Sequence, residues 1–324
     1  MFTKEVLRIN APVEAARIEK AIRQQVHGTL RRRGAVIGIS GGIDSSVVAA
    51  LCARALGADK AFGLLMPERD SSDDSLRLGR TLAASLGIQA VVEDISAALG
   101  GFGCYPRQED AIRMVVPEYG PGWRCKIVIG SLLQGDRLNL SSLTVADPAG
   151  NQRTVRPTAA AYLQLVAATN FKQRSRTMMA YYHADRLNFA VAGTPNRLEY
   201  DQGFFVKQGD GAADFKPIAH LYKSQVYELA EHLGVPEEIR RRPPTTDTFS
   251  LAQTQEEFYF ALPYQLMDLC LWARDHGVPP GEAAPVVGIT AEQAERVYRD
   301  IEAKRRVARY LHAAPLLVDD VPVS

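Results

Sequence analysis

The chain has 324 residues, of which 46% are hydrophobic and 23% charged, close to the average for soluble globular proteins. This composition excludes the collagen-like, low-complexity and wholly disordered classes. Because 38 Lys and Arg balance 37 Asp and Glu, no overall charge would hold the chain on nucleic acid or on a membrane. Any anionic partner must bind at a local site, and we expect neither a nucleic-acid nor a membrane partner.

The expected compartment is the cytoplasm. Cys52, Cys104, Cys125 and Cys270 are widely spaced and form no C-x-x-C pair, which favours reduced thiols over disulfides or a zinc site. No stretch approaches the ~18 consecutive apolar residues of a membrane-spanning helix. Residues 1–20 also lack the apolar core of a signal peptide.

Helix and strand patterns alternate through the first hundred residues. After an amphipathic helix, short apolar runs that stop at glycine or proline alternate with helical patterns. This order is typical of a doubly wound parallel sheet, which binds ligands at the carboxyl ends of its strands. The predicted fold class is therefore α/β, Rossmann-like, with flanking helices. The expected helices cover 12–31, 45–56 and 72–86, and the expected strands cover 35–39, 61–66 and 88–92.

Residues 100–157 interrupt this pattern with many glycines and prolines. We interpret them as an insertion into a single domain that covers 1–324, and we expect 126–133 and 138–145 to pair as strands within it. After the insertion the α/β pattern resumes. The later expected elements are helices over 159–187, 221–233, 258–273 and 291–310, a strand over 189–192 and a loop over 193–196.

A glycine- and serine-rich turn lies between the first expected strand and the helix after it. Its glycines let the backbone approach a ligand, its hydroxyls add donors, and the helix N-terminus adds partial positive charge, which together suit a pyrophosphate. The turn lacks the lysine of the G-x-x-x-x-G-K-[ST] loop and does not match G-x-G-x-x-G. The candidate phosphate-binding residues are Gly38, Ile39, Ser40, Gly41, Gly42, Ile43, Asp44, Ser45 and Ser46.

The S-G-G-x-D-S pattern in this turn resembles the signature of the N-type ATP pyrophosphatases, which have an adenine nucleotide alpha hydrolase-like fold. The resemblance implies that the turn binds ATP, and that ATP is cleaved between its α and β phosphates as an oxygen of the acceptor becomes adenylated. Asp44 would then hold Mg²⁺ on the leaving pyrophosphate, where the ion neutralises developing charge.

Three segments in the second half of the chain narrow the range of molecules that could accept the adenylyl group. N-F-K-Q-R-S-R-T-M begins at Asn170, G-T-P-N-R-L-E begins at Gly193, and G-F-F-V-K-Q-G-D-G-A-A-D-F-K-P-I begins at Gly203. Together with M-P-E-R-D-S-S-D-D-S, which begins at Met66, they resemble the ammonia-dependent NAD synthetases. That resemblance implies a ligase that forms a C–N bond, with ATP as co-substrate and Mg²⁺ as cofactor.

The resemblance covers about residues 12–95 and 167–316, and it implies a role for each matching position. Beside the turn, the implied ATP-binding residues are Met66, Thr194, Lys223 and Thr245, and the implied metal ligands are Asp44 and Glu199. The implied deamido-NAD-binding residues are Arg174, Lys207 and Asp214, and the implied catalytic residues are Asp44, Lys223 and Asp214.

The implied reaction needs no nucleophilic side chain. The nicotinate carboxylate of deamido-NAD attacks the α phosphate of ATP, and ammonia then displaces AMP to leave the amide. The protein places two anions side by side and screens their repulsion with Mg²⁺, Lys223 and backbone N–H groups. Ammonium must lose a proton before it attacks, and Asp214 and Asp210 are both candidate acceptors.

The chain also departs from the family pattern. Gln208 replaces a tyrosine, Ala308-Arg309 replaces a basic pair, and residues 245–260 differ in sequence. These departures leave open an ammonia-dependent amide synthetase that acts on another carboxylate. A catalytically inactive ATP-binding or regulatory protein is the alternative from a different class. The basic runs 31–33 and 240–242 are interpreted as solvated faces.

The nitrogen source and the assembly follow from the same resemblance. Thirty-four residues precede the first expected strand, which leaves no room for a glutaminase domain. We therefore expect free ammonia or a separate ammonia-supplying partner. Members of the family are similar in being homodimers with the substrate site at the subunit interface, so a homodimer is expected here. The apolar segment 258–272 is a candidate dimer contact, and ordinary core is the competing interpretation.

Overall fold

Four short parallel strands form the central sheet of the computed structural model, which describes residues 2–133, 141–246 and 248–322. The strands lie in the order β3-β2-β1-β7, and every neighbouring pair is parallel. The four strands predicted from the sequence are confirmed to within one residue at each end. They are β1 (Ala35–Gly38), β2 (Ala61–Leu65), β3 (Gln89–Val92) and β7 (Ala190–Ala192).

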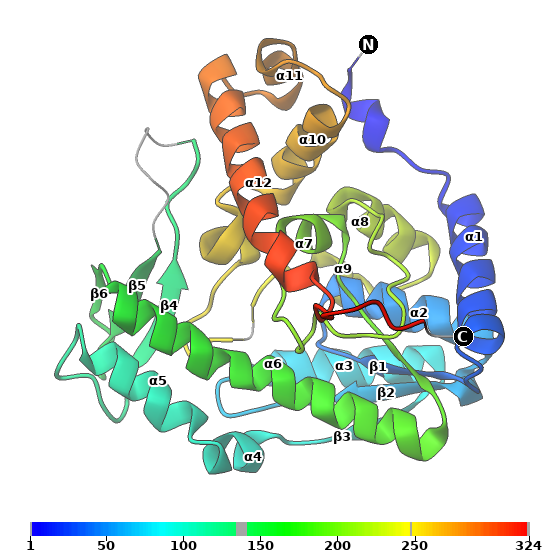
Figure 1. Ribbon diagram of the computed structural model, residues 1–324, viewed down its shortest axis with the longest axis horizontal. Coiled ribbons are helices and arrows are strands. Elements are labelled where there is room, and N and C mark those ends of the chain that lie inside the picture. The colour runs from blue at the N-terminus through cyan, green and yellow to red at the C-terminus, as the bar shows by residue number, and fades with distance from the viewer. Residues whose placement is uncertain (1, 134–140, 247, 323–324) are drawn as a thin grey trace.

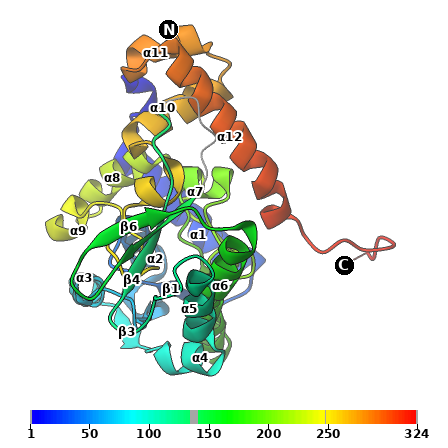
Figure 2. The same ribbon diagram turned by 90° about the vertical axis from the view of Figure 1, so that its left-hand side faces the viewer.

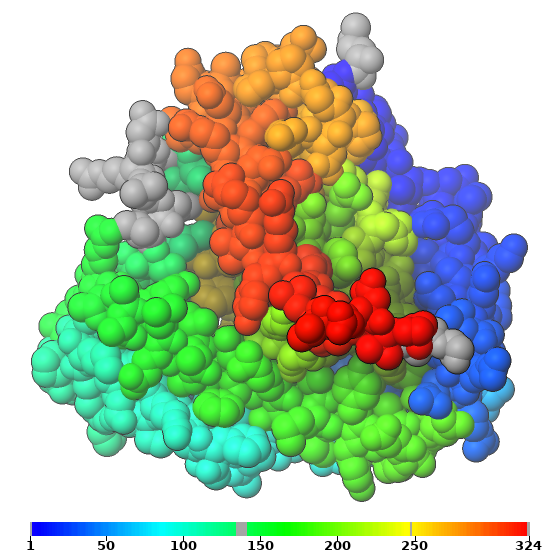
Figure 3. All heavy atoms as spheres, in the orientation of Figure 1, coloured from blue at the N-terminus to red at the C-terminus, as the bar shows by residue number. Residues whose placement is uncertain are grey.

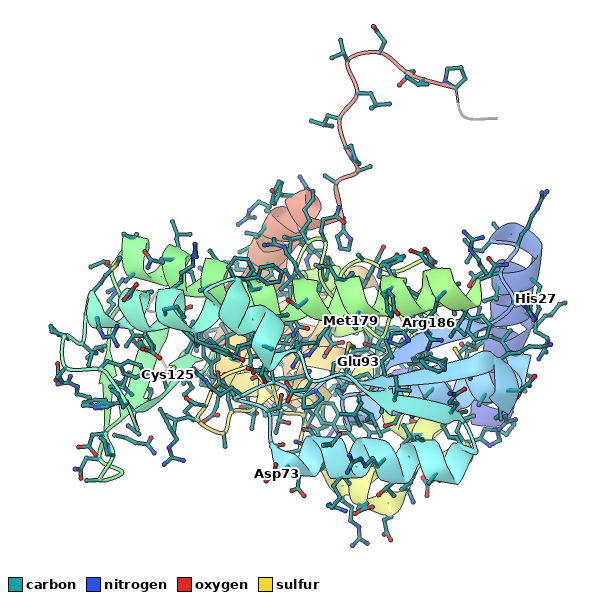
Figure 4. The ribbon with its side chains drawn as sticks, turned by 90° about the horizontal axis from the view of Figure 1, so that it is seen from below. His27, Asp73, Glu93, Cys125, Met179 and Arg186 are labelled. Carbon is teal, nitrogen blue, oxygen red and sulfur yellow. The ribbon has the colours of Figure 1, made fainter. Side chains whose placement is uncertain are left out.

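Helices cover both faces of this sheet, which confirms the predicted α/β class (Figure 1). On one face, Val36 and Phe62 pack against Ala180 and Ala184 of the long helix α6. The next residue of β1, Ile37, packs on the opposite side in the core beneath α2. Figure 4 shows α6 and α3 on opposite sides of the sheet. These helices are α1 (Ala11–Arg23), continued by the π-helical turn η2 (Gln24–Thr29), with α2 (Ile43–Leu56), α3 (Asp73–Leu86), α6 (Ala159–Leu187) and α8 (Lys223–His232).

The strand order creates a switch point between β1 and β7. The chain runs from β1 to β2 to β3 in one direction and later returns to the other side of β1 as β7. Ligands of doubly wound sheets bind at such a point, outside the carboxyl ends of the strands. The loops that follow β1 and β7 are the two loops singled out by the sequence, and the topology brings them together.

Residues 100–157, which the sequence leads us to interpret as an insertion, contain more regular structure than their sequence indicates. The two expected strands pair antiparallel, with Lys126 opposite Thr144, while positions 138–140 of the second lie outside the described residues. A third strand and the helix over 104–113 were not predicted, nor was the short helix that begins at Ser96, before this segment, and ends at Gly101. Pro106 suggested a loop, but it lies in the first turn of α5, where proline is tolerated. The elements are α4 (Ser96–Gly101), α5 (Cys104–Arg113), β4 (Arg124–Val128), β5 (Ser142–Ala146) and β6 (Gln152–Val155).

The C-terminal part of the chain forms a group of helices above the sheet in Figure 1. Instead of one expected helix over 258–273, η4 (Glu256–Phe260) and α10 (Tyr264–Asp275) are separated at Pro263, which is the N-cap of α10. The predicted helix over 291–310 is confirmed as part of α12 (Ala291–His312). Beyond it, residues 313–322 extend away from the rest of the molecule (Figure 2). The remaining elements are η1 (Lys4–Leu7), η3 (Ala58–Lys60), α7 (Arg197–Gln202), α9 (Glu237–Arg241) and α11 (Pro280–Val287).

The apolar segment 258–272 lies mostly in the interior. Met267, Leu269, Cys270 and Leu271 of α10 are buried in a cluster with residues of α11 and α12. This agrees with the interpretation of the segment as ordinary core, since its large side chains offer little apolar surface to a second chain. Among the residues that the structure describes, no helix is both long and apolar enough to cross a membrane.

Candidate active site

The turn after β1 is held in shape by its own serines. The Ser40 backbone N–H donates to Ser45 Oγ at 3.2 Å, and Ser45 Oγ donates to the Gly42 carbonyl at 3.1 Å. Ser46 Oγ donates to the same carbonyl at 2.8 Å. Ser45 and Ser46 are buried, so both hydroxyls organise the turn and the first turn of α2. The turn thus presents backbone N–H groups at a helix N-terminus, an arrangement that binds anions.

Gly41 shows why the turn requires glycine. Its φ of +73° lies in the left-handed region. A Cβ at this position would lie 2.6 Å from the Ser75 carbonyl oxygen and 3.2 Å from Leu78 Cβ. The turn therefore packs directly against the start of α3, and no side chain larger than hydrogen fits between them.

Asp44 joins the loops that follow β1 and β7. It lies in the first turn of α2 and accepts a hydrogen bond from Asn196 Nδ2 at 3.0 Å and another from Lys223 Nζ. Lys223 is buried at the start of α8, where Asp268 accepts hydrogen bonds from the backbone N–H groups of Lys223 and Ser224 at 3.2 and 2.7 Å. Asp268 is fully buried, and burial raises its pKa to about 6.

Glu199 lies next to this pair. Asn196 and Glu199 form a capping box at the start of α7, and Gln255 Nε2 donates to Glu199 Oε1 at 2.9 Å. Burial, reinforced by repulsion from Asp44, raises the pKa of Glu199 to about 8. Burial alone would lower the pKa of Lys223, but attraction to Asp44 and Glu199 outweighs it and raises the pKa. The site therefore holds two carboxylates around one lysine.

These groups line a cleft of about 800 Å³. Most of the predicted ATP-binding residues lie in its wall, together with both predicted metal ligands. Gly41 and Ser46 support the turn from outside the lining. The predicted residues in the lining are Gly38, Ile39, Ser40, Gly42, Ile43, Asp44, Ser45, Met66, Thr194, Glu199, Lys223 and Thr245.

The three residues expected to bind deamido-NAD lie outside this lining. Arg174 is exposed on α6, and its Nε and Nη2 donate to the Lys207 carbonyl at 3.3 Å. Lys207 Nζ donates to the carbonyl of Tyr310, in the last turn of α12, at 2.8 Å and to that of Ala313, the C-cap, at 2.9 Å. Asp214 accepts from the Val191 backbone N–H at 2.7 Å. The structure brings Arg174 and Lys207 together, and it places Asp214 against β7.

The other candidate proton acceptor, Asp210, does lie in the cleft wall. Its Oδ1 accepts a hydrogen bond from the Val206 backbone N–H at 2.7 Å. The residue is exposed, so its carboxylate is accessible from the open cleft. Of the two acids singled out by the sequence, only Asp210 therefore reaches the cleft.

Sequence reasoning missed the inward face of α6. Thr169, Gln173 and Arg176 line the cleft, and Arg176 Nε donates to the Met66 carbonyl at 3.3 Å. Residues three and four apart share one face of a helix, so Arg176 lies on the same side as the buried Lys172. Arg174, between them in sequence, lies on the outer side. The helical periodicity of the sequence was the signal that could have shown that Arg176, and not Arg174, faces the cleft.

A buried ion cluster lies behind the cleft wall. Lys172 Nζ is 2.9 Å from Glu68 Oε1 and 2.7 Å from Asp70 Oδ2, and it donates to the Thr248 carbonyl at 2.8 Å. Tyr105 donates to the other oxygen of Glu68 at 3.1 Å. The cluster ties α6 to the segment after β2 and to the segment around Thr248, and both segments contribute to the cleft wall.

Comparison with known proteins identifies the family of the chain. The family model described as NAD synthase matches residues 14–114 and 136–308. The chain is 66% identical over 312 residues to the NH(3)-dependent NAD(+) synthetase of Mesorhizobium japonicum, covering 96% of this chain and 98% of that protein. It is 60% identical over 320 residues to the protein of the same name from Rhizobium rhizogenes, covering 99% and 96%.

Solved structures share the fold at lower identity. The NMN synthetase of Francisella tularensis superposes with a TM-score of 0.66 at 21% identity, over 97% of this chain and 100% of that one. The NH3-dependent NAD synthetase of Campylobacter jejuni gives a TM-score of 0.62 at 21% identity, over 96% and 100%. The fold is therefore that of these synthetases, and the family match and the close relatives extend over most of the sequence. The chain belongs to the NAD synthase family.

Proposed function

We propose that this protein is an ammonia-dependent NAD synthetase. An oxygen of the nicotinate carboxylate of deamido-NAD attacks the α phosphorus of ATP, the bond to the β phosphate breaks, and pyrophosphate leaves. Ammonia then attacks the carbonyl carbon, and AMP leaves with the bonding electrons as the amide of NAD forms. The observation that carries this proposal is the Asp44–Lys223–Glu199 cluster beside a phosphate-binding turn in one cleft.

The ATP site is supported by the charges and donors at one end of the cleft. The N–H groups of the turn, the Lys223 ammonium and the Thr245 hydroxyl supply donors to phosphate oxygens. Lys223 is fixed by Asp268 through its backbone and by Asp44 through its side chain, so little reorganisation is needed when charge develops on the leaving group.

The same cluster suits Mg²⁺, the expected cofactor. Among the described residues no three His, Cys, Asp or Glu side chains gather as a metal cage. Asp44 and Glu199 offer two carboxylates, and a hard cation that keeps several waters uses one or two carboxylates together with substrate phosphates. Burial and Asp44 raise the pKa of Glu199 even with Lys223 beside it, so a second cation would favour the ionised form. When bound there, Mg²⁺ would neutralise the negative charge of the leaving pyrophosphate.

Asp210 is the better candidate to accept the proton of ammonium. It lies in the cleft wall, whereas the Asp214 carboxylate is engaged by the Val191 N–H and the Tyr181 hydroxyl. The Asp210 carboxylate is accessible from the cleft, where it can take up a proton in the reaction. Asp214 is then a residue that positions the segment after β7.

We further propose that a homodimer completes the dinucleotide site. Arg174, Met178 and Tyr182 follow one another at helical spacing on the outer face of α6, and Met178 and Tyr182 are 60% and 59% exposed. Figure 3 shows α6 crossing the front of the molecule with this side uncovered. A second chain on this face would bring its surface to Arg174 and to Lys207 beside it. Met178→Glu is expected to yield a monomer in light scattering, with loss of deamido-NAD binding.

The proposal also covers the source of the nitrogen and the cellular compartment. We propose that the nitrogen comes from free ammonia or from a separate ammonia-supplying protein; the relatives are named NH(3)-dependent. All four cysteines are free and buried, which supports a reducing compartment, the cytoplasm.

The test is a product assay. The purified protein is incubated with ATP, Mg²⁺, ammonium and deamido-NAD, and NAD, AMP and pyrophosphate are quantified. Equal amounts of the three products are expected. Asp44→Asn and Lys223→Ala should each abolish pyrophosphate release while circular dichroism stays unchanged. If AMP is released only when a different carboxylate is supplied, deamido-NAD is not the substrate. If both variants keep full activity, the assignment of the ATP site is wrong.

A further inference from the structure

We propose that Gln255 is a positioning residue for Glu199, the expected metal ligand, and that the edge strand β4 holds Gln255 in place. The inference rests on the proposed function, because it requires Mg²⁺ to bind between Asp44 and Glu199. It gives a role to residues 100–157, whose sequence interrupts the α/β pattern, and to part of residues 245–260, which depart from the family pattern.

Two donors hold the Glu199 carboxylate in one orientation. Gln255 Nε2 donates to Oε1 at 2.9 Å, and the Asn196 backbone N–H donates to Oε2 at 3.1 Å. Each carboxylate oxygen can accept a further bond, so both can still face a cation. Both donors also favour the ionised carboxylate, which is the form that binds a metal ion. Hydrogen-bond partners of this kind orient a metal ligand.

The two donors reach Glu199 from different parts of the chain. Asn196 is local, because it belongs to the capping box at the start of α7. Gln255 lies 56 residues further along, at the N-cap of η4, and its backbone N–H donates to the Pro244 carbonyl at 3.0 Å. Both Gln255 and Pro244 line the cleft. The position of Gln255 therefore depends on how the segment 248–257 is held.

The strand β4 holds this segment along its outer edge. In the order β4-β5-β6, β4 lies at one edge of the small sheet, and alternate backbone groups of an edge strand face away from its neighbour. The Cys125 N–H donates to Ser250 Oγ at 3.0 Å, and the Cys125 carbonyl accepts from the Leu251 N–H at 3.0 Å. The segment 248–257 thus satisfies backbone groups that β5 does not reach.

The same edge anchors the chain on both sides of Gln255. Two residues before it, the buried side chain of Gln253 donates from Nε2 to the Ile127 carbonyl. Two residues after it, the Glu257 carbonyl accepts from the backbone N–H of Ile129, which follows β4, at 2.8 Å. Gln255 is therefore fixed between two anchored positions, and its amide is presented to Glu199 with little freedom to move.

Nucleotide binding with and without Mg²⁺ tests the role of Gln255. Calorimetry measures the affinity for α,β-methylene-ATP, which cannot be cleaved between its α and β phosphates, in Mg²⁺ and in EDTA. The ratio of the two affinities is the gain that the metal provides. Gln255→Met removes the donor at similar volume and should lower this ratio by about 10-fold or more, while the affinity in EDTA stays within about twofold of the wild type.

Matched variants test whether β4 acts through Gln255. Gln164 Nε2 donates to the Arg107 carbonyl at 3.3 Å outside the cleft lining, so Gln164→Met should leave the ratio unchanged. Ser250→Ala removes the acceptor of the Cys125 N–H and should lower the ratio by a smaller factor, about 2- to 5-fold. Ser250→Thr keeps the hydroxyl and should restore the ratio.

The outcomes separate this inference from the proposed function. An unchanged ratio in Gln255→Met, or equal losses of affinity in Mg²⁺ and in EDTA, would overturn the role of Gln255. A wild-type ratio in Ser250→Ala would overturn the role of β4. If the wild type makes no NAD but the ratio still falls in Gln255→Met, the proposed reaction fails while the inference stands. If the wild type makes NAD but Mg²⁺ does not strengthen nucleotide binding, the inference fails alone.

Discussion

Lys172→Met is expected to destabilise the protein strongly, because it removes the buried cation that Glu68 and Asp70 share and leaves Asp70 with only its pair to Arg69. The Lys172 ammonium has three partners within 2.7 to 2.9 Å, and the side chains of Glu68 and Asp70 are 0% and 7% exposed. Removing one partner of a buried pair costs about 3–5 kcal/mol, since the remaining charge is stranded away from water. We expect the free energy of unfolding to fall by about that amount.

The assay is urea unfolding followed by tryptophan fluorescence, with Lys126→Met as the matched control. Lys126 pairs with Glu257 at 3.2 Å, but the Glu257 side chain is 46% exposed, so the control should lose no more than about 1 kcal/mol. Adding Glu68→Gln and Asp70→Asn to Lys172→Met removes the stranded charges and should recover part of the loss. Equal stability of the Lys172 and Lys126 variants would refute the reasoning.

Three further predictions concern the site and the core. Between about pH 5 and pH 8, folded Glu199 keeps a proton that the unfolded chain releases. Without Mg²⁺, the free energy of unfolding of the wild type should therefore fall relative to that of Glu199→Gln as pH rises. Free energies of unfolding that change in parallel with pH in the two proteins would contradict this. Gly41→Ala must push against Ser75 and should weaken ATP binding by ~10-fold or more, whereas Gly100→Ala, in open space, should not. Burial raises the pKa of the Cys52 thiol to about 12, and all four cysteines are buried, so a disulfide reagent should modify them only in denaturant.

Most of the correct predictions from the sequence came from patterns of residues that are close together in the chain. The turn from Gly38 to Ser46 is contiguous, so its glycines, hydroxyls and Asp44 were visible together, and the flanking apolar runs placed it between a strand and a helix. Glu199 and Lys223 lie far along the chain from Asp44, and only the resemblance linked them. Their proximity arises because β7 pairs with β1, which is a property of the sheet order.

The missed features depend on orientation and long-range packing. Arg174 and Arg176 are two residues apart in one motif, yet only Arg176 faces the cleft, and the sheet against which α6 packs decides this. Arg242 reads as part of a charged run until α3 is placed beside it. Pro106 made α5 hard to predict, because a proline in the first turn of a helix and a proline in a loop give the same local sequence signal.

An isotope measurement tests the central claim most directly. Deamido-NAD with ¹⁸O in both oxygens of its nicotinate carboxylate is converted in the presence of ATP, Mg²⁺ and ammonium, and the AMP is analysed by mass spectrometry. If the carboxylate attacks the α phosphorus in this cleft, one ¹⁸O atom remains on each AMP after ammonia displaces it. AMP without ¹⁸O, formed in step with NAD, would contradict adenylation of the carboxylate.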